Sequence, residues 1–201
     1  LADAEVDYID IPTKFYDLAF TVKETGEEII IATTRPELLG SCAMVIYNPE
    51  DERYNKKLEG KHAIVPVFNK VVPIKPHPIA NPEKGSGLVM MCSFGDLADI
   101  RFFREMNLTP IYSIGPDGRM NENAGPAAGL SVLKGREKIV SVLREQNKIR
   151  AEKQIMHRTP ICERSKDPIE FIPMKEFYVK QLDQREKMLE MANNMNFFSI
   201  L

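Results

Sequence analysis

The first half of the chain carries short apolar, β-branched runs that stop at proline or asparagine, a pattern typical of buried or edge strands. The run from Glu28 to Thr34 stops at Arg35-Pro36, as a buried strand that enters a loop would. Similar runs predict further strands over residues 42–47, 62–68, 71–74 and 88–91. Pro66 and Pro73 interrupt two of these runs in the manner of edge strands or bulges, because proline has no N–H to donate to a ladder.

The second half shows apolar residues at helical spacing instead. The pattern predicts helices over residues 96–106, 135–147 and 181–193, of which the first begins with an acidic cap. Between the first two helices, Gly115-Pro116-Asp117-Gly118 predicts a turn. No internal repeat or low-complexity tract is present, so the sequence predicts the α+β fold class with a mostly β core.

Length and composition narrow the class of protein. The 201 residues fit one sizeable domain, with or without an appendage, and the hydrophobic share of 43% and charged share of 28% are typical of soluble globular proteins. No apolar run approaches the roughly 20 residues needed to cross a bilayer, which predicts no membrane partner. The chain begins Leu1-Ala2-Asp3-Ala4, without an initiator Met or a signal peptide, which favours an excised fragment over a processed chain.

The cysteines favour a reduced environment. Cys42, Cys92 and Cys162 are odd in number and far apart, which indicates cytoplasmic localisation and no disulfide framework. His157 lies five positions before Cys162, but nothing nearby supplies the two further ligands that zinc needs. The sequence therefore predicts no metal site.

Charge is distributed unevenly along the chain. The net charge is −2, yet the segment from Lys134 to Lys166 holds ten basic and four acidic residues, so it carries +6. Such a basic stripe fits a contact with nucleic-acid phosphates, and it fits a solvated helix face with mixed charges equally well.

Three segments carry candidate chemistry. In the first, Ala32-Thr33-Thr34-Arg35-Pro36-Glu37, a strand ends in two hydroxyls, a guanidinium and a carboxylate. Hydroxyls at a strand end can hold an ester carbonyl or a ribose, and Arg35 can hold a phosphate in its fork. The alternative is a polar strand end in which Arg35 pairs with Glu37.

The second segment joins a glycine-rich loop to an acidic helix start. Gly85-Ser86-Gly87 is followed, after a strand, by Gly95-Asp96-Leu97-Ala98-Asp99. Two carboxylates three positions apart face the same way on a helix, so Asp96 and Asp99 can bind an ammonium group or orient a water molecule. The alternative is structural, with Asp96 as the N-cap and Asp99 at the capping-box position.

The third segment, Met120-Asn121-Glu122-Asn123-Ala124-Gly125-Pro126, indicates only a polar loop that ends in a turn. No motif for a nucleophile elbow, a phosphate-binding loop or a zinc protease is present, and no histidine has an obvious nucleophile beside it. The sequence therefore disfavours covalent catalysis.

These segments occur in an order that resembles the editing domains inserted into the class I aminoacyl-tRNA synthetases for valine, isoleucine and leucine. The resemblance runs nearly the length of the chain, and Ala32–Glu37 is similar to the threonine-rich peptide of that family. Several motifs resemble the valine branch of archaeal type in particular. They are Asn48-Pro49-Glu50-Asp51-Glu52-Arg53-Tyr54, Gly60-Lys61, Phe94-Gly95-Asp96-Leu97-Ala98-Asp99, Gly118–Pro126, His157-Arg158 and Cys162-Glu163-Arg164-Ser165.

The resemblance implies a fold and a division of the chain. We expect a barrel-like β core with peripheral helices over residues 1–168, and a return segment over 169–201, strand plus helix, that leads towards a catalytic core absent from this chain. The segment Glu170–Lys180 resembles that return. The His-Ile-Gly-His and Lys-Met-Ser-Lys-Ser signatures of aminoacylation are absent, so the chain is expected to edit but not to charge tRNA.

The resemblance also implies a substrate. Threonine and valine are nearly isosteric, and a hydrophobic pocket rejects an added hydroxyl only weakly, a limit for which the valine enzymes are the known example. We therefore expect hydrolysis of threonine wrongly esterified to valine tRNA, by an oriented water molecule and with help from the free ribose hydroxyl. No cofactor is expected for editing, whereas the parent enzyme uses ATP and Mg²⁺.

Site residues are carried over position by position. Asp99 is expected to bind the α-amino group of the esterified amino acid, and Asp96 to read threonine or to order water. The expected catalytic residues are Asp99, Asp96, Thr33 and Thr34, and the expected substrate-binding residues are Arg35, Glu37, Gly85, Ser86, Gly87 and Cys92. The expected partners are the 3′ end of valine tRNA and the rest of the synthetase in the same chain, with the protein a monomer.

The chain departs from the family pattern at one place. At this segment, many bacterial valine enzymes have the pattern Phe-Gly-Thr-Gly followed by Val-Lys-x-Thr. This chain instead has Lys84 before the glycine-rich loop and Met90-Met91-Cys92 after it. A thiol is a weak hydrogen-bond partner, so the departure falls on positions that would sense the threonine hydroxyl.

Three other interpretations stay open from sequence. The chain could be the editing domain of an isoleucine enzyme that clears valine, in which case the pocket would be apolar. It could be a non-catalytic tRNA-docking module, with the stripe Lys134–Lys166 as its binding surface and Asp96 and Asp99 as helix caps. An unrelated small-molecule hydrolase would lack both a nucleophile and metal ligands.

Overall fold

The computed structural model describes residues 5–175, 177 and 179–196. Residues 1–4 and parts of the predicted return segment lie outside this range. The strands are β1 (Val6–Val22), β2 (Glu28–Thr33), β3 (Cys42–Tyr47), β4 (His62–Val65), β5 (Lys70–Pro76), β6 (Val89–Cys92) and β7 (Ile149–Cys162). The α-helices are α1 (Asn55–Leu58), α2 (Leu97–Glu105), α3 (Val132–Glu145) and α4 (Arg185–Asn193), and the 3-10 helices are η2 (Pro36–Ser41), η3 (Glu122–Ala127) and η4 (Leu182–Gln184).

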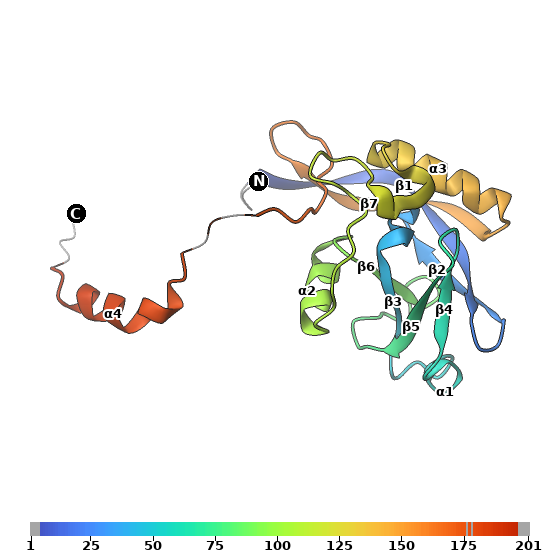
Figure 1. Cartoon of the computed structure of the whole chain (residues 1–201), viewed down its shortest axis with the longest axis horizontal. Coiled ribbons are helices and arrows are strands. Elements are labelled where there is room, and N and C mark those ends of the chain that lie inside the picture. Colours follow the sequence, from blue (N-terminus) through green and yellow to red (C-terminus); the bar gives the residue numbers. More distant parts are fainter. Residues whose placement is uncertain (1–4, 176, 178, 197–201) are drawn as a thin grey trace.

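All seven strands belong to one strongly curled sheet (Figure 1). Its order is β2-β1-β4-β5-β3-β6, with β7 paired to β1 as well, and every pairing is antiparallel except that of β3 with β5. The α+β class with a mostly β, barrel-like core is therefore confirmed. The five strands predicted in the first half are present, each shifted at its ends by three residues or fewer.

The ends of the strand order are joined by side chains rather than by a ladder. Strands β2 and β6 lie against each other, and the loop before β6 binds β2 through the Ser86 hydroxyl, which donates to the carbonyl oxygen of Ile30 at 2.5 Å. The Tyr54 hydroxyl in turn donates to the carbonyl oxygen of Ser86 at 2.7 Å. The glycine-rich loop thus fastens the open seam of the curled sheet.

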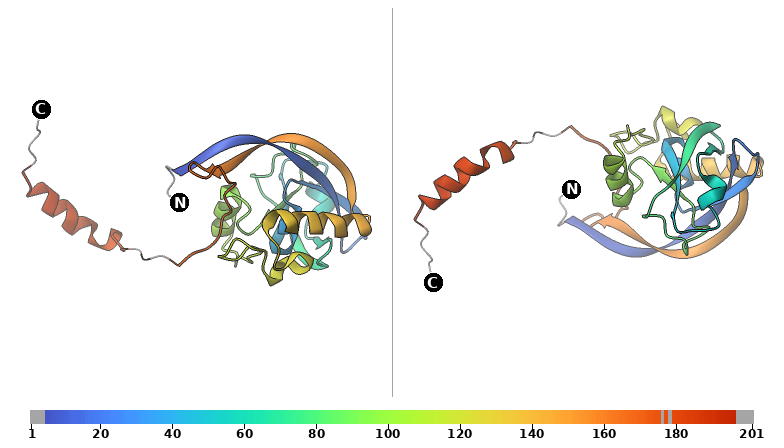
Figure 2. Two further views of the ribbon diagram at one scale, coloured as in Figure 1. Left: turned by 90° about the horizontal axis from the view of Figure 1, so that it is seen from above. Right: turned by 90° about the horizontal axis from the view of Figure 1, so that it is seen from below.

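The two longest strands, β1 and β7, were not predicted from the sequence. They pair from Val6 opposite Cys162 to Leu18 opposite Ile149, with one register shift between Asp17 and Leu18, and form a long curved ribbon (Figure 2). Within the described residues, the part of β1 before Tyr16 pairs with β7 alone, and most side chains there are exposed. Because no continuous face is buried, the apolar alternation that marks a strand is missing.

The core has two parts. The larger lies inside the curled sheet and is covered by α3, whose Ile139, Val140 and Leu143 are buried. The smaller lies beneath α2, where Phe102 and Phe103 pack on the outer strands β3 and β6. Helix α2 is held in this way by its apolar face, which fixes the position of its acidic first turn.

The last part of the chain packs on the body of the protein only up to about residue 173. The Ile169 N–H donates to the Pro160 carbonyl, Glu170 pairs with Arg35, and Ile172 packs on the core. Helix α4, by contrast, has no buried residue and lies apart from the body (Figure 1).

The packed body thus extends a few residues past the predicted boundary at 168. The strand predicted after that boundary is not found among the described residues of 169–181, whereas a helix over 185–193 is present. No helix in the described part of the chain is both long and apolar enough to cross a bilayer.

Candidate functional site

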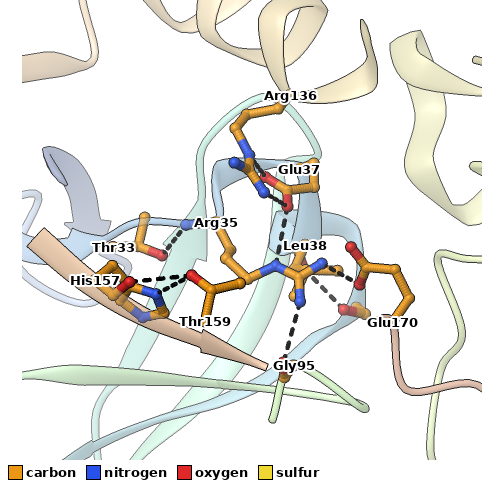
Figure 3. A network of polar contacts seen from close by, with 10 residues as sticks. Thr33, Arg35, Glu37, Leu38, Gly95, Arg136, His157, Thr159 and Glu170 are labelled. Carbon is orange, nitrogen blue, oxygen red and sulfur yellow. Dashed lines mark hydrogen bonds and ion pairs between the residues drawn. The ribbon is translucent and has the colours of Figure 1, made fainter. Parts of the chain in front are cut away.

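A buried carboxylate, Glu37, organises the turn that follows β2. Arg136 on α3 donates to both of its oxygens, from Nε at 2.9 Å and from a terminal nitrogen at 2.8 Å, and Arg35 donates from Nε at 3.0 Å (Figure 3). The remaining nitrogens of Arg35 donate to the Gly95 carbonyl at 3.1 Å and to Glu170 at 2.5 Å. One guanidinium therefore joins the turn, the start of α2 and the segment at 170.

The charges in this network satisfy one another. Burial alone would raise the pKa of Glu37, but hydrogen bonds from Arg136 and the positive charges of Arg35 and Arg136 outweigh it and lower the pKa. Burial would likewise lower the pKa of Arg35, yet Glu37 and Glu170 raise it. The ion network of Arg35, Glu37, Arg136 and Glu170 is called the frame below. Glu37 is 0% exposed, so it forms part of this frame and not of a surface that a substrate touches. This corrects the expectation that Glu37 surrounds the ester.

Arg35 is also committed to the frame. Each of its three nitrogens donates to a protein oxygen, so the guanidinium that was expected to hold a phosphate is held mainly by the protein. The structural alternative for this pair, an Arg35 to Glu37 contact, is the one observed.

Asp96 and Asp99 stand at the first turn of α2. Asp96 is exposed and is the N-cap, and its Oδ1 accepts the Asp99 N–H at 2.8 Å. Asp99 stands at the position that completes a capping box with Asp96, and hydrogen bonding to the backbone of Cys92 and Asp96 acts to lower the pKa of its carboxyl. No ion pair of Asp99 is found among the described residues.

Asp99 differs electrostatically from Glu37. Burial, together with the negative charge of Asp96, raises the pKa of Asp99 to about 7, against the lowering effect of its backbone hydrogen bonds and of Arg35. Gly95 permits this close packing, because a Cβ there would collide with Oδ2 of Asp99. A half-buried carboxylate poised near neutral pH and lacking a counter-ion is typical of a functional site.

The threonine-rich turn lies beside this helix start. Thr33 is buried and its hydroxyl accepts the Arg35 N–H at 3.0 Å, while Thr34 is partly exposed. The hydrogen bond from Arg35 to the Gly95 carbonyl links the turn to the loop before Asp96. The structure therefore brings together two of the predicted segments.

His157 was not selected from the sequence, and the structure places it next to this turn (Figure 3). Its Nδ1 lies 3.1 Å from Oγ1 of Thr159. Burial and the positive charges of Lys84 and Arg35 lower the pKa of the imidazole, so it is neutral at neutral pH. No local spacing signals this position, because β7 reaches the turn only through its long pairing with β1.

The glycine-rich loop is structural in this arrangement. Gly85 and Gly87 have φ of 62° and 86°, and a Cβ at either residue would press on neighbouring atoms, of Ala32 and of Arg53 respectively. The Ser86 hydroxyl is already bonded to Ile30. These contacts show that the loop fastens the seam of the sheet, while Gly85 stays exposed and its expected role in substrate binding remains a prediction.

Cys92 lies beneath the surface. It is 2% exposed and faces Cys42 on the neighbouring strand. A hydrogen bond with Cys42 and burial raise the pKa of its thiol well above the ordinary value. Cys92 thus belongs to the core behind Asp99, which corrects its expected place among substrate-binding residues.

The basic stripe is largely neutralised. Six of its ten cationic residues form ion pairs: Arg136 with Glu37, Arg144 with Glu152, Lys148 and Arg150 with Glu28, Arg164 with Glu5, and Lys166 with Asp7. The stripe also divides between α3 and β7, so it is not one helix face. Within the described residues, no three His, Cys, Asp or Glu side chains gather in a way that could hold a metal ion.

The sequence has extensive relatives. No family model matches the chain. It is 43% identical over 197 residues to the valine–tRNA ligase of Nanoarchaeum equitans, which covers 98% of this chain and 26% of that protein. Against the valine–tRNA ligase of Aeropyrum pernix the identity is 41%, over 98% of this chain and 24% of that protein. These relatives confirm the resemblance to the valine branch, and the chain spans about a quarter of their length.

The fold also has a counterpart among solved structures. The leucyl-tRNA synthetase agnB2 of Agrobacterium radiobacter K84, solved in a ternary complex with tRNA and LeuAMS, matches with a TM-score of 0.51. The match covers 77% of this chain and 21% of that chain at 16% identity. At that identity, the likeness shows a shared fold.

Proposed function

Over 98% of its length this chain is homologous to a segment of the valine–tRNA ligases, and from this premise we propose that it is the editing domain of such an enzyme. Its reaction is hydrolysis of the ester bond in threonyl-tRNA made for valine. The relatives from Nanoarchaeum equitans and Aeropyrum pernix are both valine–tRNA ligases, which favours valine over isoleucine as the parent specificity.

The observation that carries the proposal is the unpaired Asp99 beside the threonine-rich turn. An ammonium ion is the ligand that best satisfies a half-buried carboxylate, and a charged hydrogen bond of this kind contributes about 1.5–3 kcal/mol. The free α-amino group of an aminoacyl ester supplies such a cation. Asp99 therefore holds the amino acid by its ammonium group and directs the ester carbonyl towards water.

The frame supports this chemistry from one side. Arg35 fixes the Gly95 carbonyl and the turn in one rigid arrangement, so Thr34 and the start of α2 keep their separation. Asp96 is exposed and keeps one carboxylate oxygen beyond the cap bond, which is available to order the attacking water. Water is the nucleophile in this scheme, and no protein residue forms a covalent intermediate.

The test is single-turnover hydrolysis of threonyl and valyl esters of valine tRNA by this chain, at high protein concentration. We expect threonine to be released faster than valine. Asp99→Asn is expected to slow threonine release by roughly 100-fold, the loss of one charged hydrogen bond. Asp117→Asn is the matched control, because it changes the charge of a carboxylate in an exposed turn and leaves the rate unchanged.

Binding of tRNA without hydrolysis of either ester would overturn the proposal and favour a docking module. The pairing of six cations in the basic stripe argues against that alternative, because five carboxylates of the chain already offset part of their charge. A slope of tRNA affinity against salt concentration measures how many phosphates the chain contacts.

A further inference from the structure

A half-buried histidine, His157, has no part in the reaction described above. It lies on β7, and Thr159, two positions along the strand, shares its face of the ribbon. The Thr159 hydroxyl has one proton, which it donates to the carbonyl oxygen of His157 at 3.1 Å. The same hydroxyl oxygen lies 3.1 Å from Nδ1 of the imidazole. In that second contact the hydroxyl is therefore the acceptor, and Nδ1 carries the proton of the ring.

This contact leaves the other ring nitrogen with a free lone pair. Burial and the positive charges of Lys84, Arg35 and Arg136 lower the pKa of the imidazole against the opposing charge of Asp96, so the ring is neutral. A neutral imidazole with its proton on Nδ1 is an acceptor at Nε2. Within the described residues no hydrogen bond of Nε2 is found, and the atom is open to solvent. His157 thus offers an unused acceptor.

The face of the ribbon that carries His157 runs from the glycine-rich loop to the threonine-rich turn. Side chains alternate along a strand, so Lys153, four positions earlier on β7, shares this face. Lys153 stands over the ring of Phe15, 6.0 Å from its centroid, and Phe15 Cζ lies 3.7 Å from the position that a Cβ of Gly85 would take. At the other end, His157 lies beside the turn, close enough for the charge of Arg35 to act on its ring (Figure 3).

Two cations on the loop side have no carboxylate partner. Lys84 and Lys153 are exposed, and neither forms an ion pair within the part of the chain that the structure describes. The charge of Lys84 acts on His157 more strongly than that of Asp96, so the imidazole belongs to the loop side of the site. In a nucleotide the ribose is attached to an anionic phosphate, and unpaired lysines are suitable counter-ions for it. This side of the site therefore suits the nucleotide end of a substrate.

We propose that Nε2 of His157 accepts a hydrogen bond from the free hydroxyl of the ribose that carries the ester. This inference rests on the proposed hydrolysis of threonyl esters. An aminoacyl nucleotide has a donor on each side of its ester bond, the ammonium group and this vicinal hydroxyl. With the ammonium held at Asp99, a hydroxyl held at His157 fixes the ester from its other end, so its carbonyl stays directed towards water. Thr159 is a positioning residue, because it sets the tautomer of the ring.

The test uses variants that separate the two ring nitrogens. His157→Asn keeps an N–H donor near the place of Nδ1 and removes the acceptor, so cleavage of the threonyl ester should slow roughly tenfold, the worth of one hydrogen bond. His157→Gln brings an amide oxygen near the place of Nε2 and should keep most of the rate. His62→Asn is the matched control, because His62 pairs with Glu24 at the surface of β4 and should leave the rate unchanged.

A second substrate identifies the group that the acceptor binds. A threonyl ester on valine tRNA whose terminal nucleotide lacks the vicinal hydroxyl removes the proposed donor. The unaltered chain should cleave this ester at least tenfold more slowly than the normal one. His157→Asn should cause no further loss, because the hydroxyl and the acceptor contribute the same bond.

The outcomes separate this inference from the proposed function. If His157→Asn keeps the full rate on the normal ester, or slows both esters alike, the inference is overturned and the hydrolase stands. Equal losses in His157→Asn and His157→Gln, with a lower urea midpoint of unfolding in both, would assign the ring to the fold and overturn it too.

If the unaltered chain cleaves neither ester, the proposed function fails, and NMR still decides the inference. The probes are the non-hydrolysable threonylamides of aminodeoxyadenosine, with and without the vicinal hydroxyl. The nitrogen-15 signal of His157 Nε2 is expected to shift only with the probe that has the hydroxyl. Equal shifts with the two probes would overturn the inference.

Discussion

Two groups of acidic side chains lie close together in this molecule and have opposite electrostatics. Glu37 is fully buried between two guanidiniums, and its pKa is lowered. Asp99 is half-buried next to another carboxylate, Asp96, and its pKa is raised to about 7. A single residue, Arg35, bonds to Glu37 and to the carbonyl of Gly95, and so sets the two groups side by side.

The difference separates frame from site. A buried charge that is fully paired has nothing left to offer a ligand, whereas a carboxylate held without a counter-ion gains from binding a cation. The motif with the most candidate functional groups in the sequence, Thr33 to Glu37, contributes mainly to the frame. The pair that looked most like an ordinary helix cap, Asp96 and Asp99, supplies the site while also serving as the cap.

The largest effect is expected from breaking the frame. Glu37→Gln removes the negative charge and leaves Arg35 and Arg136 facing each other, which should lower the free energy of unfolding by about 3 kcal/mol in urea titrations. Glu170→Gln, in which a partly exposed partner is lost, should cost no more than about 1 kcal/mol. If the two variants are equally stable, Glu37 is not the anchor described here.

A smaller effect concerns pH. Because the folded pKa of Asp99 is about 7 and its unfolded value is near 3.9, the folded state binds more protons between about pH 4 and pH 7, so the contribution of Asp99 to stability falls as pH rises through that window. Asp99→Asn should therefore gain stability relative to the unaltered chain, by roughly 2 kcal/mol at pH 8 after allowance for partial exposure.

The measurement is the difference in unfolding free energy between the two proteins from pH 4 to pH 8. The difference isolates Asp99, because the lowered pKa of Glu37 contributes to both proteins with the opposite sign: its stabilisation is lost as pH falls. A difference that does not change with pH would contradict the raised pKa. Together with the lost hydrolysis, a gain in stability would show that Asp99 is held at a cost to the fold.

The smallest effect sharpens the role of Asp96. Asp96→Ala should destabilise the chain by about 1 kcal/mol through loss of the N-cap, and Asp96→Asn should not, because asparagine caps equally well. Both variants remove the negative charge that raises the pKa of Asp99, so the pH midpoint of Asp99 should move down in each. Titration of the Asp99 carboxyl by NMR measures that midpoint, and an unmoved midpoint would leave burial as the sole cause.

Much of the fold could be predicted because its signals are local. The strand over 42–47 was predicted at its observed bounds, since a buried strand is apolar along its whole length. Helix α2 was predicted from its cap and from the spacing of its apolar residues. The ribbon of β1 and β7 was missed for the converse reason. Its residues from Val6 to Lys14 pair only with a strand more than a hundred positions away, and little of their surface is buried.

The candidate site divides in the same way. Asp96 and Asp99 lie within one helical turn, so their spacing alone set them on one face, and the threonine-rich turn was visible as a strand end. The sequence by itself thus determined which residues could cap, turn or bind. Their roles depended on partners far along the chain: Arg136 lies 99 positions from Glu37, and Glu170 lies 135 positions from Arg35. Only the tertiary structure decided which of these charges are paired and which side chains are buried, because pairing and burial are properties of three-dimensional neighbours and not of spacing along the chain.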